Sequence, residues 1–313
     1  AVLIRSIIDH ASIENNYDII ILEREISEEN KRLLKIFEAE RDNISIRFYE
    51  PSVALSVEGK RPDRFPFVVY YSLFAPFILE NFKKIIVMDS DMLVCEDIAL
   101  LLRMDLEGRS VAAAQDILIQ GSYYGEYIVS PLKIKTREYL HDTLGMRNAI
   151  NYVNAGILLF DCEKWRREMN INTLLSAAKK EDFTLIDQDL LNVLMEGNIK
   201  VLPFAWNVQI VLNRHYSRAV ESAPDAMRQD YGEALDHPYV LHWAGRPKPW
   251  ICPDVPKGNE WWAAAIRTPF IGHILARMVD GLEVRREYYW EQHKKKVSVW
   301  EPIPKLEDTS DGS

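Results

Sequence analysis

Apolar and polar positions along the first two hundred residues predict helices and strands in alternation. Apolar residues recur at helical spacing in one set of segments, whereas shorter runs rich in β-branched residues are typical of strands. This alternation predicts an α/β fold built on a central sheet. The predicted helices are Val2–His10, Ser27–Arg41, Pro66–Asn81, Thr136–Leu144, Glu163–Lys180 and Ile186–Glu196, and the predicted strands are Tyr17–Leu22, Ile44–Tyr49, Ile85–Met88, Val111–Gln115, Gly156–Phe160, Ile199–Leu202 and Tyr239–His242.

The pattern changes after the last predicted strand. Four prolines, Pro247, Pro249, Pro253 and Pro256, interrupt regular structure, and an amphipathic stretch then runs from Ile266 to Trp300. We therefore expect one domain over residues 1–262 and a helical tail over residues 263–313, in which Glu307–Ser313 is disordered.

Composition narrows the classes of protein. A hydrophobic share of 48% in 313 residues supports a sizeable core, and a net charge of −9 argues against nucleic-acid binding, which requires a basic surface. The three cysteines are widely spaced, so neither a disulfide framework nor a zinc site is indicated, and we expect a cytoplasmic location. No apolar run reaches the roughly 20 residues of a membrane-spanning helix.

The strongest candidate chemistry follows the apolar run Ile85–Met88. Its β-branched content is typical of a parallel strand covered on both faces, and functional groups gather at the carboxyl ends of such strands. Asp89 and Asp91 stand at this end. Two carboxylates so close repel one another unless a cation intervenes, and hard oxygen ligands suit Mg²⁺ or Mn²⁺ that bridges a phosphate-bearing substrate. A pair with this spacing is also common in ordinary loops, where it caps helices.

Two further polar groups adjoin predicted elements. Asn154 precedes two small residues and an apolar strand, so its amide either donates to sugar hydroxyls or forms a turn. Asp187, Gln188 and Asp189 open a predicted helix. Capping explains part of this cluster but gives no reason for Gln188 or Asp189, so the cluster can also hold sugar hydroxyls near an anomeric carbon.

The last predicted strand ends in His242, and Gly245, Lys248 and Trp250 follow it. A neutral imidazole can complete a coordination sphere begun by carboxylates, and histidine with aspartate favours Mn²⁺ slightly over Mg²⁺. Lys248, between two prolines, can meet a phosphate as a point charge. A single histidine on a strand is also compatible with a structural role.

Together, these blocks resemble glycosyltransferase family 8. They are Met88–Asp91, Asn154–Gly156, Asp187–Asp189 and His242–Trp250, and the resemblance spans about residues 1–262. It implies a GT-A fold, which is a Rossmann-like nucleotide-diphospho-sugar transferase fold with a mixed central sheet, here followed by a helical C-terminal appendage. It also implies a retaining hexosyltransferase that uses Mn²⁺ or Mg²⁺, a UDP-glucose or UDP-galactose donor, and a glycan or lipopolysaccharide-type, lipid-linked acceptor.

The resemblance assigns roles position by position. Asp89, Asp91 and His242 fall on the metal ligands. Gln188, Asp187 and Asp116 fall near the reacting sugar and acceptor and are the implied catalytic residues. Because an amide such as that of Gln188 is a poor nucleophile, we expect front-face attack by the acceptor hydroxyl. The implied donor-binding residues are Asp89, Ser90, Asp91, Asn154, Ala155, Asp187, Gln188, His242, Gly245 and Lys248.

Two features depart from the family pattern. The motif Tyr-x-Arg-Leu is Tyr70-Tyr71-Ser72-Leu73 here, so Ser72 replaces an arginine expected to contact the donor. Family members also begin with a central strand whose end binds the uracil ring, whereas this sequence starts in the helix that follows it. Because loss of that strand would leave backbone groups unpaired on both flanks, we expect the strand to precede Ala1.

Two other functions are compatible with the sequence. Ser72 favours a non-catalytic module that binds sugar nucleotides or glycans. A D-x-D phosphohydrolase would use the first aspartate as nucleophile, but that function leaves His242–Trp250 unexplained. The basic and aromatic tail, which includes Arg277 and Trp290, indicates either peripheral contact with anionic lipid or a plain solvated helix.

Overall fold

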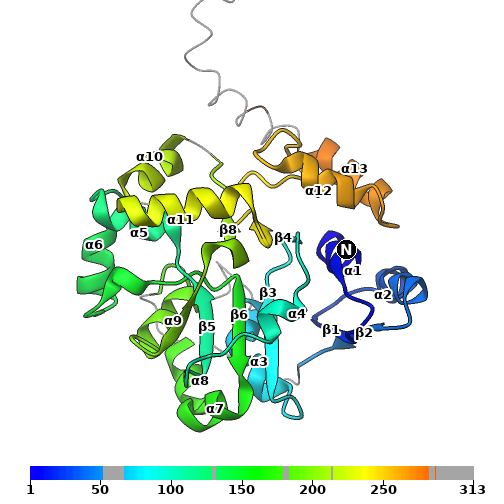
Figure 1. Ribbon diagram of the computed structural model, residues 1–313, viewed down its shortest axis with the longest axis horizontal. Helices are drawn as coiled ribbons and strands as arrows, with labels where there is room; N and C mark the ends of the chain where they lie inside the picture. The colour runs from blue at the N-terminus through cyan, green and yellow to red at the C-terminus, as the bar shows by residue number, and fades with distance from the viewer. Residues whose placement is uncertain (52–66, 129–131, 179–182, 213, 282–285, 287–313) are drawn as a thin grey trace, which may run out of the picture.

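The computed structural model describes residues 1–51, 67–128, 132–178, 183–212, 214–281 and 286 (Figure 1). Short 3₁₀ or π turns in this part of the chain cover Ile36–Glu40, Phe67–Tyr70, Tyr139–Thr143, Ala149–Asn151 and Phe204–Trp206. The α-helices are α1 (Val2–His10), α2 (Glu28–Lys35), α3 (Tyr71–Ile78), α4 (Ala99–Leu102), α5 (Ile117–Tyr124), α6 (Thr136–Glu138), α7 (Cys162–Glu168), α8 (Ile171–Ala178), α9 (Asp187–Leu194), α10 (Arg214–Ser222), α11 (Asp225–Asp236), α12 (Gly258–Ala265) and α13 (Ile271–Asp280).

The described strands form three sheets. The central sheet has the order β3 (Lys84–Met88), β6 (Ile157–Asp161), β5 (Val111–Ala114) and β7 (Ile199–Leu202). A second sheet has the order β4 (Met92–Val94), β9 (Val240–His242) and β8 (Val208–Gln209), and β1 (Tyr17–Leu22) pairs in parallel with β2 (Ile44–Tyr49).

The central sheet is mixed, as predicted. Strands β3 and β5 run antiparallel to β6, while β7 runs parallel to β5. The prediction that Ile85–Met88 is a parallel strand was therefore wrong, because an apolar run reports burial and not the direction of its neighbour. Met88 at the end of β3 lies opposite Ile157 at the start of β6.

Both faces of the central sheet are covered. Leu158 and Phe160 of β6 belong to a core cluster shared with α3, α7, α8 and α9, whereas Ile157 and Leu159 belong to a cluster shared with α1, β1 and β2. Successive residues of a strand point to opposite faces, so a strand buried on both sides is apolar throughout. This explains the uninterrupted apolar run in β6.

Most predicted elements are present, although several bounds differ. Ser27 accepts a hydrogen bond from the Asn30 N–H and caps α2, which ends at Lys35 and passes into a 3₁₀ turn. The single helix predicted over Glu163–Lys180 is divided between α7 and α8, because Asn170 caps a new helical start through the Asn172 N–H. The elements α4, α5, α10, α11, α12, β4 and β8 had not been predicted.

The predicted tail lies only partly within the described residues. Helix α13 forms part of the amphipathic stretch Ile266–Trp300, and Glu307–Ser313 lies outside the described residues. None of the helices in the described ranges is long and apolar enough to cross a membrane. Contact with a membrane surface stays a prediction.

A cavity of about 1160 Å³ lies between β1 and β3 and extends to Asp89 and Asp91. Every residue of β1 and of β3 lines it. Because successive side chains point to opposite faces, a cavity lined by consecutive residues faces the edge of each strand. Among the described strands, β1 pairs only with β2, and β3 only with β6. The strand expected before Ala1 stays a prediction.

Candidate active site

Strand pairing brings Asp89, Asp91 and His242 together from distant parts of the sequence. Asp89 directly follows β3, and Asp91 directly precedes β4. In the antiparallel pair of β4 and β9, Met92 lies opposite His242, so the carboxylate of Asp91 comes to lie beside the imidazole. The backbone N–H of Asp89 donates to the carbonyl of Gly156 at 2.8 Å and ties the loop to the start of β6.

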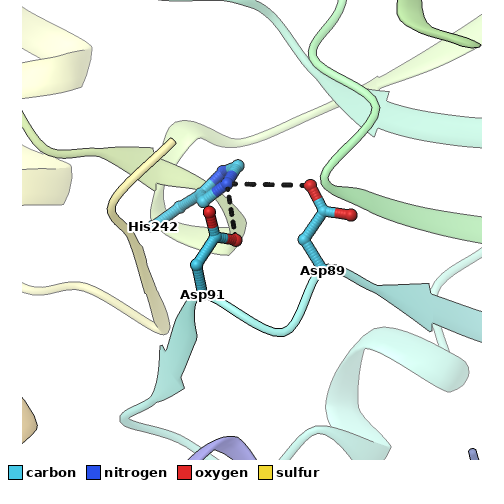
Figure 2. Close-up of side chains that lie close together, drawn as sticks. All are labelled: Asp89, Asp91 and His242. Carbon is cyan, nitrogen blue, oxygen red and sulfur yellow. Dashed lines mark ion pairs between the residues drawn. The ribbon is translucent and has the colours of Figure 1, made fainter. Parts of the chain in front are cut away.

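The three side chains form a group that can hold a metal ion (Figure 2). His242 Nε2 lies 3.3 Å from Asp91 Oδ1 and 3.8 Å from Asp89 Oδ2. The ligand atoms of all three residues lie within 4.8 Å of one another. Asp91 Oδ1 is buried and has no hydrogen-bond partner. A buried oxygen of this kind requires a partner, and a divalent cation shared with His242 and Asp89 would supply one.

The two aspartates differ in their affinity for a proton. Desolvation by the surrounding groups, partly opposed by His242, raises the pKa of Asp89 above its usual value, while 54% of its side chain stays exposed. Burial alone would also raise the pKa of Asp91, but His242 and Lys248 outweigh it and hold that pKa well below the usual value. The ammonium of Lys248 donates to Asp91 Oδ2 and, at 2.5 Å, to the carbonyl of Trp243. Asp91 therefore gives up its proton more readily than Asp89 does.

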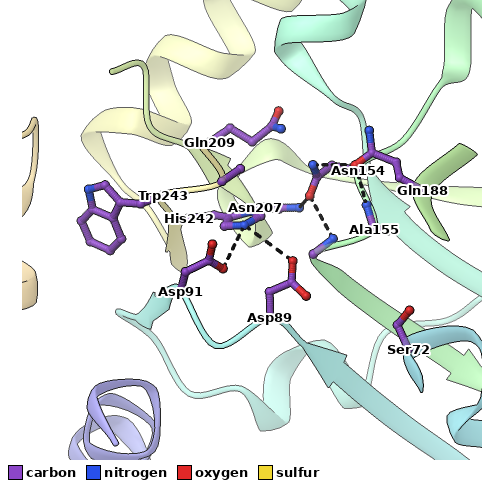
Figure 3. Close-up of polar contacts among 12 residues, drawn as sticks. Ser72, Asp89, Asp91, Asn154, Ala155, Gln188, Asn207, Gln209, His242 and Trp243 are labelled. Carbon is purple, nitrogen blue, oxygen red and sulfur yellow. Dashed lines mark hydrogen bonds and ion pairs between the residues drawn. The ribbon is translucent and has the colours of Figure 1, made fainter. Parts of the chain in front are cut away.

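Asn207, which had not been predicted as a site residue, orients the imidazole. Its Oδ1 lies 2.9 Å from His242 Nδ1, and its Nδ2 donates to Asn154 Oδ1 at 2.8 Å (Figure 3). When Nδ1 donates its proton to Asn207, the lone pair of Nε2 faces the aspartates, which is the tautomer that a metal ligand needs. The only feature of the sequence that could have identified Asn207 as a site residue is that it and Gln209 are polar within an apolar stretch.

Two predicted sugar-binding amides line the cavity close to the aspartates. Asn154 Nδ2 donates to Gln188 Oε1 at 2.9 Å, and the backbone N–H of Ala155 donates to the same oxygen at 3.2 Å. Asn154 Oδ1 accepts from the Gly156 N–H at 2.9 Å. These bonds fix the orientation of both amide groups, since the nitrogen of an amide donates and its oxygen accepts.

Asp116 lies behind these amides. Its Oδ2 accepts from Asn154 at 3.1 Å, from Gln188 at 3.1 Å and from Gln209 at 3.0 Å. Its Oδ1 accepts two backbone N–H groups and caps α5. Asp116 is 4% exposed and is not among the described residues that line the cavity. The geometry thus gives Asp116 a part in orienting the amides, and its implied catalytic role stays a prediction.

Asp187 and Ser72 meet at the wall of the cavity. Ser72 Oγ donates to Asp187 Oδ2 at 2.8 Å. Burial and the nearby charge of Asp89 raise the pKa of Asp187 to about 7. Ser72 supplies a hydrogen bond at the position where the family resemblance implies an arginine, but it supplies no charge. The Asp187 carboxyl therefore keeps its proton to a higher pH than an ordinary aspartate does.

The other predicted residues are divided between the cavity and its surroundings. Ser90 and Ala155 line the cavity, whereas Gly245 packs near the side chains of Leu212 and Tyr216. Lys248 reaches the site through Asp91. The side chain of Asp189 is fully buried and does not reach the cavity, so it does not hold a sugar hydroxyl in this structure.

Comparison with known proteins gives similarities to a protein family, to a curated relative and to solved structures. A family model described as Glycosyl transferase family 8 matches residues 1–252. General stress protein A of Bacillus subtilis is 24% identical over 253 residues, which cover 78% of this chain and 80% of that protein.

Two solved structures resemble this one. The apo structure of the WbbM bifunctional glycosyltransferase has a TM-score of 0.78 and 30% identity, and covers 89% of this chain. The galactosyltransferase LgtC, solved in complex with donor and acceptor sugar analogs, has a TM-score of 0.64 and 20% identity over 86% of this chain and 92% of its own. This chain spans 49% of the WbbM chain, about half its length.

These similarities confirm the GT-A fold that the sequence motifs implied. The matched region contains the Asp89, Asp91 and His242 group, the two amides and Asp187. This chain belongs to glycosyltransferase family 8.

Proposed function

We propose that this protein transfers glucose or galactose from a UDP-sugar to a hydroxyl of a glycan or lipopolysaccharide-type acceptor, with retention of the anomeric configuration. The observation that carries the proposal is the convergence of Asp89, Asp91 and His242 at a cavity that two fixed amides also line. The cavity volume of about 1160 Å³ is large enough for a nucleotide sugar, since ligand pockets commonly span about 300–1000 Å³. LgtC, of similar fold, was solved with donor and acceptor sugar analogs.

The charges near the aspartates suit a metal-bound diphosphate. Asp89, Asp91 and His242 would hold Mn²⁺ or Mg²⁺, which would neutralise charge on the leaving diphosphate. Lys248 already donates to Asp91 and lies close enough to add a second positive charge without giving up a proton. The unpaired oxygen of Asp91 supports this assignment, because nothing in the described protein satisfies it.

The polar groups near Asp187 suit a neutral hexose. Asn154 and Gln188 line the cavity with amide groups whose orientation is fixed, and Asp187 can exchange hydrogen bonds with hydroxyls. A hexuronate would bring a second carboxylate beside Asp187, where Ser72 offers no compensating charge. We therefore expect UDP-glucose or UDP-galactose to be preferred over UDP-hexuronates.

In the proposed reaction the acceptor hydroxyl attacks C1 of the sugar on the face from which UDP leaves. The bond between C1 and the diphosphate oxygen breaks, and the acceptor proton passes to that oxygen. Gln188 and Asn154 hold the sugar, and Asp116 holds Gln188 and Asn154 in place. None of these groups needs to form a covalent intermediate, which agrees with the poor nucleophilicity of an amide.

A UDP-release assay with UDP-glucose and UDP-galactose in Mn²⁺ tests the proposal, with calorimetry of UDP and Mn²⁺ alongside it. We expect metal-dependent release that Asp91→Asn abolishes and that Asp225→Asn, a carboxylate 94% exposed on α11, leaves unchanged. Binding of UDP without turnover of either sugar would instead support a binding module. Hydrolysis of a phosphomonoester without UDP release would indicate a phosphohydrolase.

The cytoplasmic location also stays a prediction.

A further inference from the structure

We infer that Asp189 is a positioning residue, whose buried carboxylate holds the turn before α9 so that Asp187 and Gln188 face the donor sugar. The inference rests on the proposed function, because the two residues that it positions are those assigned to the sugar. Asp189 itself contacts no cavity-lining side chain by a described hydrogen bond, and it acts through the backbone of the turn.

Three hydrogen bonds link Asp189 to the turn and to two tyrosines, and a fourth links one of these tyrosines to the turn. Asp189 Oδ1 accepts from the Tyr152 hydroxyl at 2.5 Å, and Oδ2 accepts from the Tyr139 hydroxyl at 2.5 Å and from the Leu185 N–H at 2.6 Å. The oxygen of Tyr139 in turn accepts from the Thr184 N–H at 2.8 Å. The backbone on both sides of the Thr184–Leu185 peptide is thus fixed by one buried carboxylate and one phenol.

The turn that these bonds hold is strained. Ile186 has φ 54° and ψ −111°, a conformation that β-branched side chains rarely adopt. Such a conformation persists only where the surroundings determine it, and it is common at ligand sites. Because Asp187 and Gln188 directly follow Ile186, relaxation of this one residue would redirect both side chains. Their present contacts, with Ser72 and with Asn154, depend on the strained geometry.

The hydrogen bonds at position 189 require a carboxylate. Three donors converge on two oxygens, and an asparagine would replace one oxygen by an NH₂ group. If that NH₂ group faced Leu185, it would meet the backbone N–H, and two donors cannot bond to each other. The backbone N–H cannot turn into an acceptor. If it faced Tyr152, that hydroxyl would have to turn within a fully buried site. The variant Asp189→Asn therefore either loses the bond to Leu185 or has to reverse a buried hydroxyl, while it keeps the size of the side chain.

A comparison of Asp189→Asn with a core variant separates a positioning role from a loss of stability. Calorimetry in Mn²⁺ gives the dissociation constants of UDP and of UDP-galactose or UDP-glucose. The quotient, which is the constant of UDP divided by that of the UDP-sugar, reports the contribution of the sugar alone. We expect Asp189→Asn to lower the quotient roughly tenfold, which is the typical effect of one charged hydrogen bond on affinity. The dissociation constant of UDP should stay unchanged. Tyr139→Phe, which removes the bonds to Asp189 and Thr184, should lower it in the same direction. Leu174→Ala creates a cavity in the core at α8 and should leave it unchanged.

An unchanged quotient in Asp189→Asn, or an equal change in Leu174→Ala, would overturn the inference. Amide hydrogen exchange gives a second readout that does not depend on the sugar. The Thr184 and Leu185 amides should exchange faster in Asp189→Asn, while those of β6 keep their rates. If the wild-type protein binds neither UDP nor a UDP-sugar, the proposed function fails, and exchange at Leu185 still decides whether Asp189 holds the turn: an unchanged rate there contradicts it.

Discussion

Replacing Asp187 by asparagine should stabilise the folded protein at alkaline pH. The pKa of Asp187 is about 7 in the folded chain, against an ordinary 3.8, because burial and the charge of Asp89 disfavour its ionised form. The folded state therefore keeps a proton that the unfolded state loses above about pH 4. The contribution to the free energy of unfolding is fully present below that pH and is lost as the pH rises to about 7.

The size of the effect follows from the two pKa values. At about 1.4 kcal/mol for each tenfold change in proton affinity, the difference corresponds to at most about 4 kcal/mol. Because the side chain lies in a cavity open to solvent and keeps its bond to Ser72, we expect about half of this, roughly 2 kcal/mol. Asp187→Asn removes the charge and keeps the size of the side chain.

Urea unfolding without metal or nucleotide, at about pH 4.5 and about pH 8, measures the difference between the two proteins. Asp187→Asn should exceed the wild type by about 2 kcal/mol at the higher pH and by much less at the lower pH. Asp225→Asn, on the exposed face of α11, should stay within about 0.5 kcal/mol of the wild type at both. An Asp187→Asn variant whose advantage does not grow with pH would refute the reasoning.

Three further substitutions test the other parts of the site. Ser72→Arg places a cation beside Asp187 and should raise the affinity for UDP-galacturonate relative to UDP-galactose in calorimetry; equal affinities would show that the missing arginine is compensated elsewhere. Gly156→Ala should weaken Mn²⁺ binding at least tenfold, since a Cβ would lie 2.4 Å from His242 Cε1. The control Gly272→Ala, which has open space around the added Cβ, should bind Mn²⁺ as the wild type does. Wild-type Mn²⁺ binding in Gly156→Ala would contradict the geometry. Lys248→Ala should reduce the affinity for UDP at fixed Mn²⁺ by roughly tenfold while binding of Mn²⁺ alone persists, and a variant with unchanged UDP affinity would remove Lys248 from the diphosphate site.

Local pattern predicted the elements that carry the site. The apolar run before Asp89, the small residues after Asn154 and the strand that ends in His242 all occur where the sequence indicated. Strand direction could not be predicted in this way, because hydrophobicity does not report the direction of a neighbouring strand, and β3 pairs with an antiparallel one. The pairing of Met92 with His242 is likewise a long-range register that no local pattern encodes.

The supporting residues were harder to predict. Asn207 orients His242 and Asp116 orients Gln188, yet both are single polar residues whose partners are distant in the sequence. The sequence grouped Asp189 with Asp187 and Gln188, whereas helical geometry turns it into the core toward two tyrosines. Hydrogen bonds between distant side chains depend on the completed fold, so sequence spacing alone identifies the polar residues but not what each one contacts.

The central claim is that Asp89, Asp91 and His242 bind one ion together. A Mn²⁺ titration followed by electron paramagnetic resonance, on the wild type, Asp91→Asn, His242→Ala and the double variant, tests it most directly. We predict at least a tenfold loss of affinity in each single variant and a smaller further loss in the double variant than additivity requires, because ligands of one ion are coupled. Wild-type affinity in His242→Ala, or strictly additive losses, would contradict the claim.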